Sequence, residues 1–392
     1  MQVPERIRSI SPPFMDELHT RSEALRRDGV DLISLGQGVP GFAPVDTAID
    51  SARQSLLDPT THVYGAVAGL KSLREALSER LREDNGMKTD PEREMLIIAG
   101  ANYGFLLAML TLLEPGDKVL LPSPYYFDHE MGIRIVGGIP VEVPLREETG
   151  FQLTLADLKP HLQTEPRALV MVSPNNPTGA VYEPGEMRNI ARVLTSQGIT
   201  IISDETYQHF TYDGAKHFSL GSLAEARSHV ITIGSFSKTY SLTGWRVGYL
   251  VSDADYLQQA LKIQDSMMVC TPIVSQMAAL GALRTPRDEL TRRREMLAGR
   301  RRLLIDRLAS IPSLTWRPTR GSYFAFVRVQ GCTDSIALAA DLLERAHLAV
   351  VPGRVFGKNG EGYLRLSYGS VGLDELAEAC KRLAQYFGTI PA

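Results

Sequence analysis

The chain has 392 residues, which is more than one hydrophobic core of usual size holds, so two domains are expected. Hydrophobic residues make up 44% of the chain and charged residues 22%, values that are ordinary for a globular enzyme. The 42 basic and 45 acidic side chains give a formal net charge of −3, which excludes the strongly basic surface of a protein that binds nucleic acid or an anionic membrane.

The first predicted element is a helix that ends at residues 26–29, where two arginines and Gly29 supply a basic last turn and a stop. From about residue 45 to 285, short apolar runs alternate with helical stretches such as Tyr103–Leu113 and Pro184–Ser196. Most of these runs are apolar on both faces, which is typical of a sheet covered on both sides. The seven predicted strands are Met95–Ala99, Lys118–Leu121, Pro140–Val143, Ala168–Val172, Thr200–Ser203, Val230–Gly234 and Val247–Val251. We therefore expect an α/β domain over residues 45–285 with a mostly parallel seven-stranded sheet.

Beyond residue 285 the pattern changes to that of a smaller α+β domain, which we expect residues 1–44 to join. Its predicted elements are a long helix at Arg287–Ser310, a strand at Tyr323–Val329, a helix at Ser335–Ala346, strands near Leu348–Val351 and Tyr363–Ser367, and a last helix from Leu373. The arginine clusters Arg292–Arg294 and Arg300–Arg302 are interpreted as the solvated face of the long helix, because leucines between them form an apolar stripe. The small domain is thus predicted over residues 1–44 and 286–392.

The three cysteines indicate a reducing compartment. Cys270, Cys332 and Cys380 lie far apart and no Cys-x-x-Cys pair exists, so neither a metal site nor a disulfide framework is expected. The first residues lack the apolar core of a signal peptide, and no apolar run approaches the length that spans a bilayer. We expect a cytoplasmic protein that does not act at a membrane.

Lys238 is the most informative residue, because a predicted strand runs directly into it through Ser235 and Ser237. Ligands bind at the carboxyl ends of strands in open α/β sheets, so a lysine there is placed for chemistry rather than for the surface. Asp204 ends the preceding strand, where a buried carboxylate is costly unless it has a partner such as a protonated ring nitrogen. Tyr207, three residues later, lies on the same side of a turn.

Further groups along the chain match a phosphorylated aldehyde cofactor. Asn176 follows a buried strand at the same rim of the sheet and can donate to a ring oxygen, as can Tyr207. Gly100, Ala101 and Asn102 open a helix whose free backbone N–H groups suit a phosphate. Arg246 supplies a cation, and Ser235 and Ser237 supply hydroxyl groups. Together these are the amine, carboxylate, ring-oxygen donors and phosphate ligands that pyridoxal phosphate needs.

These motifs resemble those of the class I/II aminotransferases, the fold type I family of pyridoxal phosphate-dependent enzymes, over nearly the whole chain. The resemblance implies that Lys238 forms a Schiff base with the cofactor and moves the α-proton, that Asp204 binds the ring nitrogen, and that Tyr207 and Asn176 bind the ring oxygen. It implies a phosphate site and a substrate carboxylate site. The phosphate ligands are Ala101, Asn102, Ser235, Ser237 and Arg246, and the α-carboxylate ligands are Arg365, Gly38 and Asn176.

The resemblance also implies a stacking ring, a homodimer and two cis peptide bonds. Tyr126 matches the aromatic residue that stacks on the cofactor. Tyr64 matches a tyrosine that reaches the other subunit's phosphate, so a homodimer with shared active sites is expected. The bonds Ser123–Pro124 and Asn176–Pro177 are expected to be cis, as in relatives.

Substrate choice is less specific in the sequence. No extra arginine for a distal carboxylate is identified, and the Gly-Gln-Gly at residues 36–38 resembles relatives that accept neutral, sulfur-containing or aromatic amino acids. Asp16 and Glu17 are candidates to select a cationic side chain, although acidic residues are also favoured in the first turn of any helix. Alanine variants compared on arginine and methionine would decide between these interpretations, since equal losses would remove the first.

Three functions remain open at this stage. The leading hypothesis is transfer of an amino group from an L-amino acid to a 2-oxo acid. The second keeps the cofactor but has the enzyme act as a lyase, cyclase or oxidase, because the same carbanion supports each outcome. The third is a cofactor-binding regulator without catalysis, which we do not favour because no DNA-binding module fits before the Gly-Gln-Gly motif.

Overall fold

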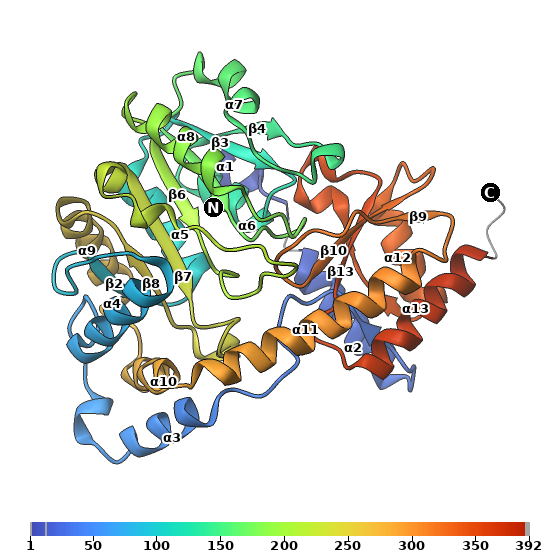
Figure 1. The fold of residues 1–392 in the computed structure, drawn as a ribbon, viewed down its shortest axis with the longest axis horizontal. Coiled ribbons are helices and arrows are strands. Elements are labelled where there is room, and N and C mark those ends of the chain that lie inside the picture. The colour runs from blue at the N-terminus through green and yellow to red at the C-terminus, as the bar shows by residue number, and fades with distance from the viewer. Residues whose placement is uncertain (1, 12–13, 389–392) are drawn as a thin grey trace.

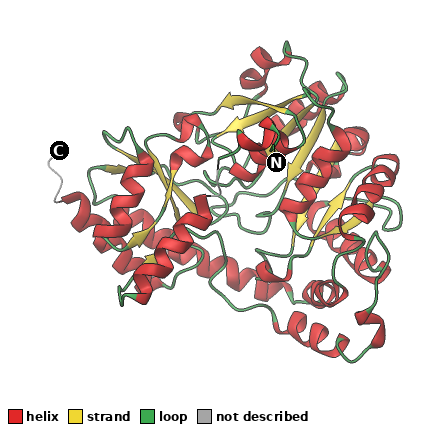
Figure 2. Cartoon of the chain, turned by 180° about the vertical axis from the view of Figure 1, so that it is seen from behind, coloured by secondary structure: helices red, strands yellow, loops and turns green. Residues whose placement is uncertain are grey.

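The computed structural model describes residues 2–11 and 14–388, and its fold is built around two separate groups of strands (Figures 1 and 2). The larger group is a seven-stranded sheet in the order β2-β8-β7-β6-β5-β3-β4. Its strands are β2 (Met95–Ile98), β3 (Lys118–Ser123), β4 (Ile139–Pro144), β5 (Ala168–Val172), β6 (Thr200–Asp204), β7 (Val230–Ser235) and β8 (Gly248–Val251). All seven predicted strands are therefore confirmed, with small differences at their ends.

The sheet is mostly parallel, as predicted, because β4, β3, β5, β6 and β7 pair in parallel. Only β8 runs against its neighbours β7 and β2. Alternate residues of β5 enter different cores. Leu169 and Met171 pack with Met187 and Ile190, whereas Val170 packs with Phe105 on the other side. Because both faces of β5 are buried, its sequence is a continuous apolar run.

Helices cover the large sheet. They are α3 (Asp46–Ser55), α4 (Lys71–Asn85), α5 (Ala101–Leu112), α6 (Phe127–Ile135), α7 (Leu155–Leu162), α8 (Pro184–Thr195), α9 (Ala254–Met268) and α10 (Ile273–Leu283). Helix α8 shows why these segments are helical. It begins with a proline, which is tolerated in the first turn, and it buries Met187, Ile190, Ala191 and Leu194 at the spacing of one helix face.

The second group of strands is a four-stranded antiparallel sheet in the order β12-β13-β10-β9. Its strands are β9 (Leu314–Thr315), β10 (Phe324–Val329), β12 (Val351–Pro352) and β13 (Tyr363–Ser367), and the helices beside it are α11 (Arg287–Leu308), α12 (Ser335–Arg345) and α13 (Leu373–Gly388). Helix α11 runs from α10 to α13 and so spans both groups of strands (Figure 1).

The N-terminal segment contains α1 (Glu5–Arg8), α2 (Phe14–Arg27) and β1 (Ile33–Ser34). Strand β1 pairs in parallel with β11 (Leu348–Ala349), so this segment meets the C-terminal part of the chain. The predicted strand at residues 348–351 is wrong as one element. It is divided between β11 and β12 because the first half bonds to β1 and the second half bonds to β13 in another sheet. The division into two domains remains a prediction.

The interpretation of the arginine clusters as a solvated face is correct for Arg292, Arg294 and Arg302, which are exposed, and wrong for the other three arginines. Arg293, Arg300 and Arg301 are all at most 5% exposed. Their guanidinium groups donate to the main-chain carbonyl oxygens of Ala43, Gly369 and Thr319, respectively. Because α11 has chain segments on more than one side, these three arginines are buried against polar backbone, and Arg293 and Arg301 also pair with the carboxylates of Glu289 and Asp213.

Candidate active site

The carboxyl ends of β5, β6 and β7 meet at one edge of the large sheet, where the structure forms a small cavity of about 130 Å³, which we call the site cavity. It is lined by Ala101, Asn102, Tyr126, Val172, Asn176, Asp204, Thr206, Tyr207, Ser235, Ser237, Lys238 and Arg246. Ten of these twelve residues carry a predicted role, all except Val172 and Thr206. The parallel order of the strands brings them together, because such strands end at the same edge.

The amine of Lys238 points across the site cavity and donates a hydrogen bond to the carbonyl oxygen of Gly38 at 2.8 Å. Burial of the side chain, together with the positive charges of Arg246 and Arg365, lowers the pKa of Lys238 to about 8. An amine with this pKa is partly uncharged near neutral pH, and the uncharged form is the nucleophile.

This lowered pKa predicts the pH dependence of cofactor uptake by the ligand-free protein. Below pH 8 most Lys238 amines are protonated and have no free electron pair, so the rate of uptake is expected to rise with pH through a midpoint near 8. The rate of the absorbance change after mixing with pyridoxal phosphate measures it. A midpoint near the ordinary lysine value of 10.5 would contradict the prediction.

Asp204 is held as a buried anion at the floor of the site. Its Oδ1 accepts a hydrogen bond from the backbone N–H of Thr206 at 3.0 Å, and its Oδ2 lies 3.3 Å from Nε2 of His129. Burial opposes ionisation of the carboxyl group, but the contacts with His129 and Thr206 outweigh it, so the pKa of Asp204 is lowered. The carboxylate is therefore available to a cationic partner.

His129 was not predicted from the sequence. It lies in α6, is buried, and packs its ring 4.3 Å from that of Phe105. In the sequence, His129 could be linked to the site only through Tyr126, which lies three positions earlier. This spacing places both side chains near one helix face. The sequence separation between His129 and Asp204 does not indicate their contact, because the tertiary fold brings the two residues together.

Arg365 lies in β13 and is 2% exposed. Its Nη1 donates to Oδ1 of Asn176 at 3.0 Å, and its Nη2 donates to the carbonyl oxygen of Gly36. Its guanidinium carbon lies 4.6 Å from the ring centre of Phe324 and 5.1 Å from that of Phe356. Burial lowers the pKa of Arg365 to about 10, and its Nε has no hydrogen-bond partner within the described residues. A buried cation with an unused donor needs an anionic ligand.

The opposite end of the site cavity carries Arg246 and the start of α5. Arg246 donates to the carbonyl oxygens of Thr243 and Ala99. A Cβ atom at Gly100 would lie 2.5 Å from Nη2 of Arg246, so only glycine lets the guanidinium approach the helix start. Asn102 and Tyr126 both donate to Oδ2 of Asp128, a residue that the sequence did not single out. Burial, followed by the charge of Asp128, raises the pKa of Tyr126.

Six of the predicted site residues lie outside the lining of the site cavity: Gly38, Gly100, Arg365, Tyr64, Asp16 and Glu17. Arg365 is connected to the cavity through its bond to Asn176. Gly38 is nonetheless adjacent, because its carbonyl oxygen accepts from Lys238 and from Tyr323, a further residue that was not predicted. Tyr64 is 83% exposed. Asp16 and Glu17 are exposed in the first turn of α2, and Glu17 lines a separate cavity of about 980 Å³ between the N-terminal segment, α6 and α12. Their proposed role in substrate choice gains no support from this position.

Both expected cis bonds, Ser123–Pro124 and Asn176–Pro177, are present, and Ser173–Pro174 is also cis. Within residues 2–11 and 14–388, no group of three or more histidine, cysteine or acidic side chains is arranged to hold a metal ion. The same part of the chain contains no helix with the length and apolar character needed to traverse a bilayer.

Comparisons with known proteins show that the chain is similar to aminotransferases. The model of the family "Aminotransferase class I and II" matches residues 30–383. The chain is 36% identical over 385 residues to a probable aspartate/prephenate aminotransferase of Aquifex aeolicus, covering 96% of each protein. It is 35% identical over 387 residues to an aspartate aminotransferase of Pyrococcus abyssi, covering 98% of this chain and 97% of the relative.

The solved structures that are similar to this chain include aminotransferases as well. An aromatic aminotransferase from Pyrococcus horikoshii superposes with a TM-score of 0.88 and 36% identity, covering 95% of this chain and 98% of that one. An aspartate aminotransferase from Thermus thermophilus with maleate superposes with a TM-score of 0.91 and 31% identity, covering 98% and 99%.

Proposed function

The chain belongs to the class I and II aminotransferases. From this premise we propose which residues bind the cofactor and the substrate, which residue transfers the proton, and which amino acid is the donor. It is a pyridoxal phosphate-dependent aminotransferase, which moves an amino group from an L-amino acid to a 2-oxo acid. The relatives favour this reaction over elimination, cyclisation or oxidation. The roles of individual residues, the donor and the oligomeric state are the proposed part.

The residues of the site cavity fit pyridoxal phosphate. Lys238 offers an amine of lowered pKa, Asp204 offers a buried carboxylate, and Arg246 with Ser235 and Ser237 offers a cation and two hydroxyl groups. The absent Cβ of Gly100 leaves room at the phosphate end. When bound, the cofactor supplies an aldehyde carbon that reacts with amines and a ring that accepts an electron pair from the substrate.

We assign a role in cofactor binding or proton transfer to each of these side chains. Asp204 holds the proton on the ring nitrogen, and its low pKa keeps it ionised for that purpose. Tyr207 and Asn176 donate to the ring oxygen. Lys238 would take the proton from the α-carbon of the bound amino acid with Nζ and hold it there for its return during the transfer. The backbone at Ala101 and Asn102 helps Arg246 to bind the phosphate, and the ring of Tyr126 stacks on the cofactor.

The unused, buried donor of Arg365 is the observation that carries the proposed substrate class. The guanidinium lies against the rings of Phe324 and Phe356, and it bonds to Asn176, which lines the site cavity. A planar cation of this kind binds a carboxylate through two parallel hydrogen bonds. We therefore assign it to the α-carboxylate, which every amino acid substrate carries.

For the donor we propose L-aspartate, because several of the relatives are named aspartate aminotransferases. An aromatic L-amino acid is the second candidate, since one relative and one similar structure carry that name. The test is a single half-reaction. Holoenzyme is mixed with L-aspartate, L-phenylalanine, L-methionine or L-arginine without an acceptor, and the conversion of the cofactor to its amine form is followed by absorbance. Conversion with neither aspartate nor phenylalanine would overturn the proposal.

We also propose that the protein forms a homodimer in the cytoplasm. The stretch that holds Tyr64 exposes apolar side chains, including Leu57 at 88% and Val63 at 63%, which is unusual for a surface that faces only water. The three cysteines are free thiols, which suits a reducing compartment.

Replacing Tyr64 with phenylalanine tests the dimer. If the hydroxyl group reaches the phosphate of the other subunit, its loss removes one hydrogen bond to a charged group, and the dissociation constant of the cofactor is expected to rise about ten-fold. Equilibrium titration of the cofactor measures this effect, and sedimentation gives the mass. A monomer, or a dimer with unchanged cofactor affinity, would contradict the assigned role of Tyr64.

A further inference from the structure

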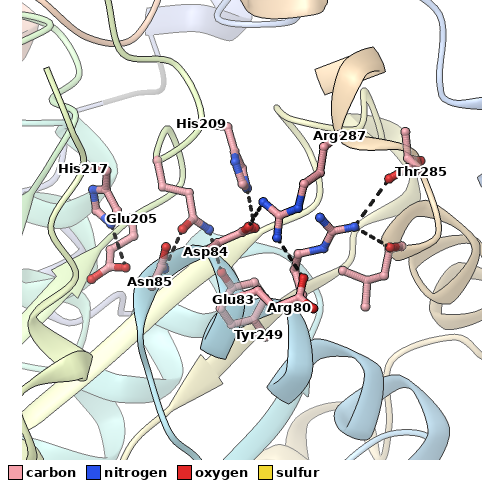
Figure 3. Close-up of polar contacts among 12 residues, drawn as sticks. Arg80, Glu83, Asp84, Asn85, Glu205, His209, His217, Tyr249, Thr285 and Arg287 are labelled. Carbon is pink, nitrogen blue, oxygen red and sulfur yellow. Dashed lines mark hydrogen bonds and ion pairs between the residues drawn. The ribbon is translucent and has the colours of Figure 1, made fainter. Parts of the chain in front are cut away.

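The segment that follows β6 presents two different faces. Asp204 and Tyr207 point into the site cavity. Glu205, Gln208 and His209 are not part of the lining and have other polar partners: Glu205 accepts from Ser203, Gln208 donates to Tyr249, and His209 lies near Asp84. Figure 3 shows Glu205 beside His217 and His209 beside Asp84. The contacts on this second face act together with main-chain hydrogen bonds, such as that from the N–H of Glu205 to the carbonyl oxygen of Ile233, to hold the backbone that carries Asp204 and Tyr207.

The last turn of α4 contacts this second face. Asn85 donates from Nδ2 to Oε1 of Gln208 at 2.7 Å, and Gln208 in turn donates to the hydroxyl oxygen of Tyr249 in β8 at 2.9 Å. One residue earlier, Oδ2 of Asp84 lies 3.9 Å from Nε2 of His209. Burial lowers the pKa of His209 to about 4, so its ring is neutral and this contact is polar rather than ionic.

The same turn of α4 also holds the start of α11. Arg287, the first residue of α11, places Nη1 2.6 Å from Oδ1 of Asp84 and Nη2 2.8 Å from Oε2 of Glu83. Arg80 donates to the carbonyl oxygens of Leu283 and Thr285 just before α11 begins. Figure 3 shows that Arg287 and His209 both point toward Asp84.

Helix α11 continues from this point into the C-terminal part of the chain. Leu297, Leu304 and Leu308 belong to the same core as Leu364 of β13, the strand that carries Arg365. The turn at Arg80–Asn85 is therefore the point at which one helix end contacts both the segment bearing Asp204 and Tyr207 and the helix that leads to the substrate-binding strand.

We propose that Asp84 and Arg287 are positioning residues for the reaction, and that their contact couples the start of α11 to the placement of Asp204 and Tyr207. Neither residue touches the site cavity. The charge of Asp84 is mostly shielded from water and has Arg287 as its cationic partner, so loss of Arg287 leaves this carboxylate poorly compensated. Loss of Asp84 leaves Arg287, whose side chain is 57% exposed, with Glu83 and water, but removes one of the two ion pairs that hold the start of α11. Helix α4 ends directly after Asn85 at Gly86, whose φ is 68°, so a shift of the last turn moves the bond between Asn85 and Gln208.

This inference rests on the proposed function of the site, and its test uses the holoenzyme without turnover. Asp84→Ala, Arg287→Ala and the double variant are compared by two measurements. One is the dissociation constant of pyridoxal phosphate, and the other is the pH midpoint of the absorbance change of the bound cofactor. Each single variant is expected to raise the dissociation constant about five-fold and to move the midpoint in the same direction, and the double variant is expected to match the single ones.

A simple effect of charge gives the opposite pattern. Removing an anion and removing a cation would move the midpoint in opposite directions, and the double variant would return to wild-type values, which would overturn the proposal. A purely structural role would lower the melting temperature of the ligand-free protein without changing either cofactor measurement, and this result would overturn it too. Arg292→Ala is the matched control, because Arg292 lies on the same helix but pairs only with Glu289 on its own helix, away from α4.

Arg287→Lys is a milder variant that keeps the test informative if one of the alanine variants does not fold. Lysine keeps the positive charge but cannot bond to Glu83 and Asp84 through a planar fork, so a smaller effect in the same direction is expected. A wild-type protein that does not bind pyridoxal phosphate would refute the proposed function itself. A wild-type protein that binds it normally, with all variants behaving like Arg292→Ala, would refute only the coupling.

Discussion

Replacing Lys238 with alanine is expected to lower the rate of amino transfer about 10⁴-fold, the largest effect of any single substitution in this chain. The variant loses both the amine that attaches to the cofactor and the base that moves the proton at the α-carbon. No second amine lines the site cavity to replace it. The measurement is a single-turnover reaction of holoenzyme with L-aspartate, followed by cofactor absorbance.

Covalent attachment gives a second readout for the same variant. After reduction with borohydride, the cofactor is expected to stay on the peptide that contains Lys238 in the wild-type protein and to be lost from the variant under denaturing conditions. Lys381→Ala serves as a control, because Lys381 is an exposed lysine that pairs with Glu378 on α13. Full activity of the Lys238 variant, or a label on another peptide, would refute the assignment.

Replacing Arg365 with leucine is expected to lower kcat/KM about 10³-fold, because the substrate carboxylate would face a buried site without a cation. Leucine is chosen since it fills part of the space between Phe324 and Phe356 without a charge. Steady-state kinetics on L-aspartate and on L-phenylalanine measure the effect. The same loss is expected for both donors, because both carry the α-carboxylate.

The control for Arg365 is Arg328→Leu. Arg328 lies on the neighbouring strand β10 and stacks over Tyr363, but it is exposed and does not reach the site. Its replacement is expected to leave kcat/KM within about two-fold of the wild-type value. A loss at position 365 confined to one donor would assign Arg365 to side-chain recognition and refute its proposed role with the α-carboxylate.

The sequence predicted the large sheet and most of the site cavity because these features depend on local pattern and strand order. Strands β5 and β13 have the predicted ends, since each is a short apolar run bounded by turn residues. Lys238, Asp204 and Asn176 could be found because each follows such a strand, and parallel strands end at one edge of the sheet.

Other features could not be predicted because they depend on contacts between distant segments. His129 of α6 meets Asp204 at the end of β6 only in the folded chain, and no spacing in the sequence reports that distance. The environment of Asp84 is similar, because this residue of α4 meets His209 from the segment after β6 and Arg287 from α11. The burial of Arg293 was missed because arginines in a helix are more often solvated, and the segment at Ala43 that covers it is about 250 residues away in sequence.

The buried arginines of α11 bond to peptide oxygens, and this choice of partner affects how the protein tolerates change. A peptide oxygen is present whatever side chain a residue carries, so substitutions at positions 43 and 319 can alter the side chain while keeping the acceptor. An interface built only from complementary side chains needs paired mutations to change, whereas a peptide acceptor needs only that the arginine persists. Arg293 and Arg301 also pair with Glu289 and Asp213, and these two carboxylates are expected to vary less than the residues that supply peptide oxygens. Around the long helix, natural variation is therefore expected to be concentrated on the acceptor side.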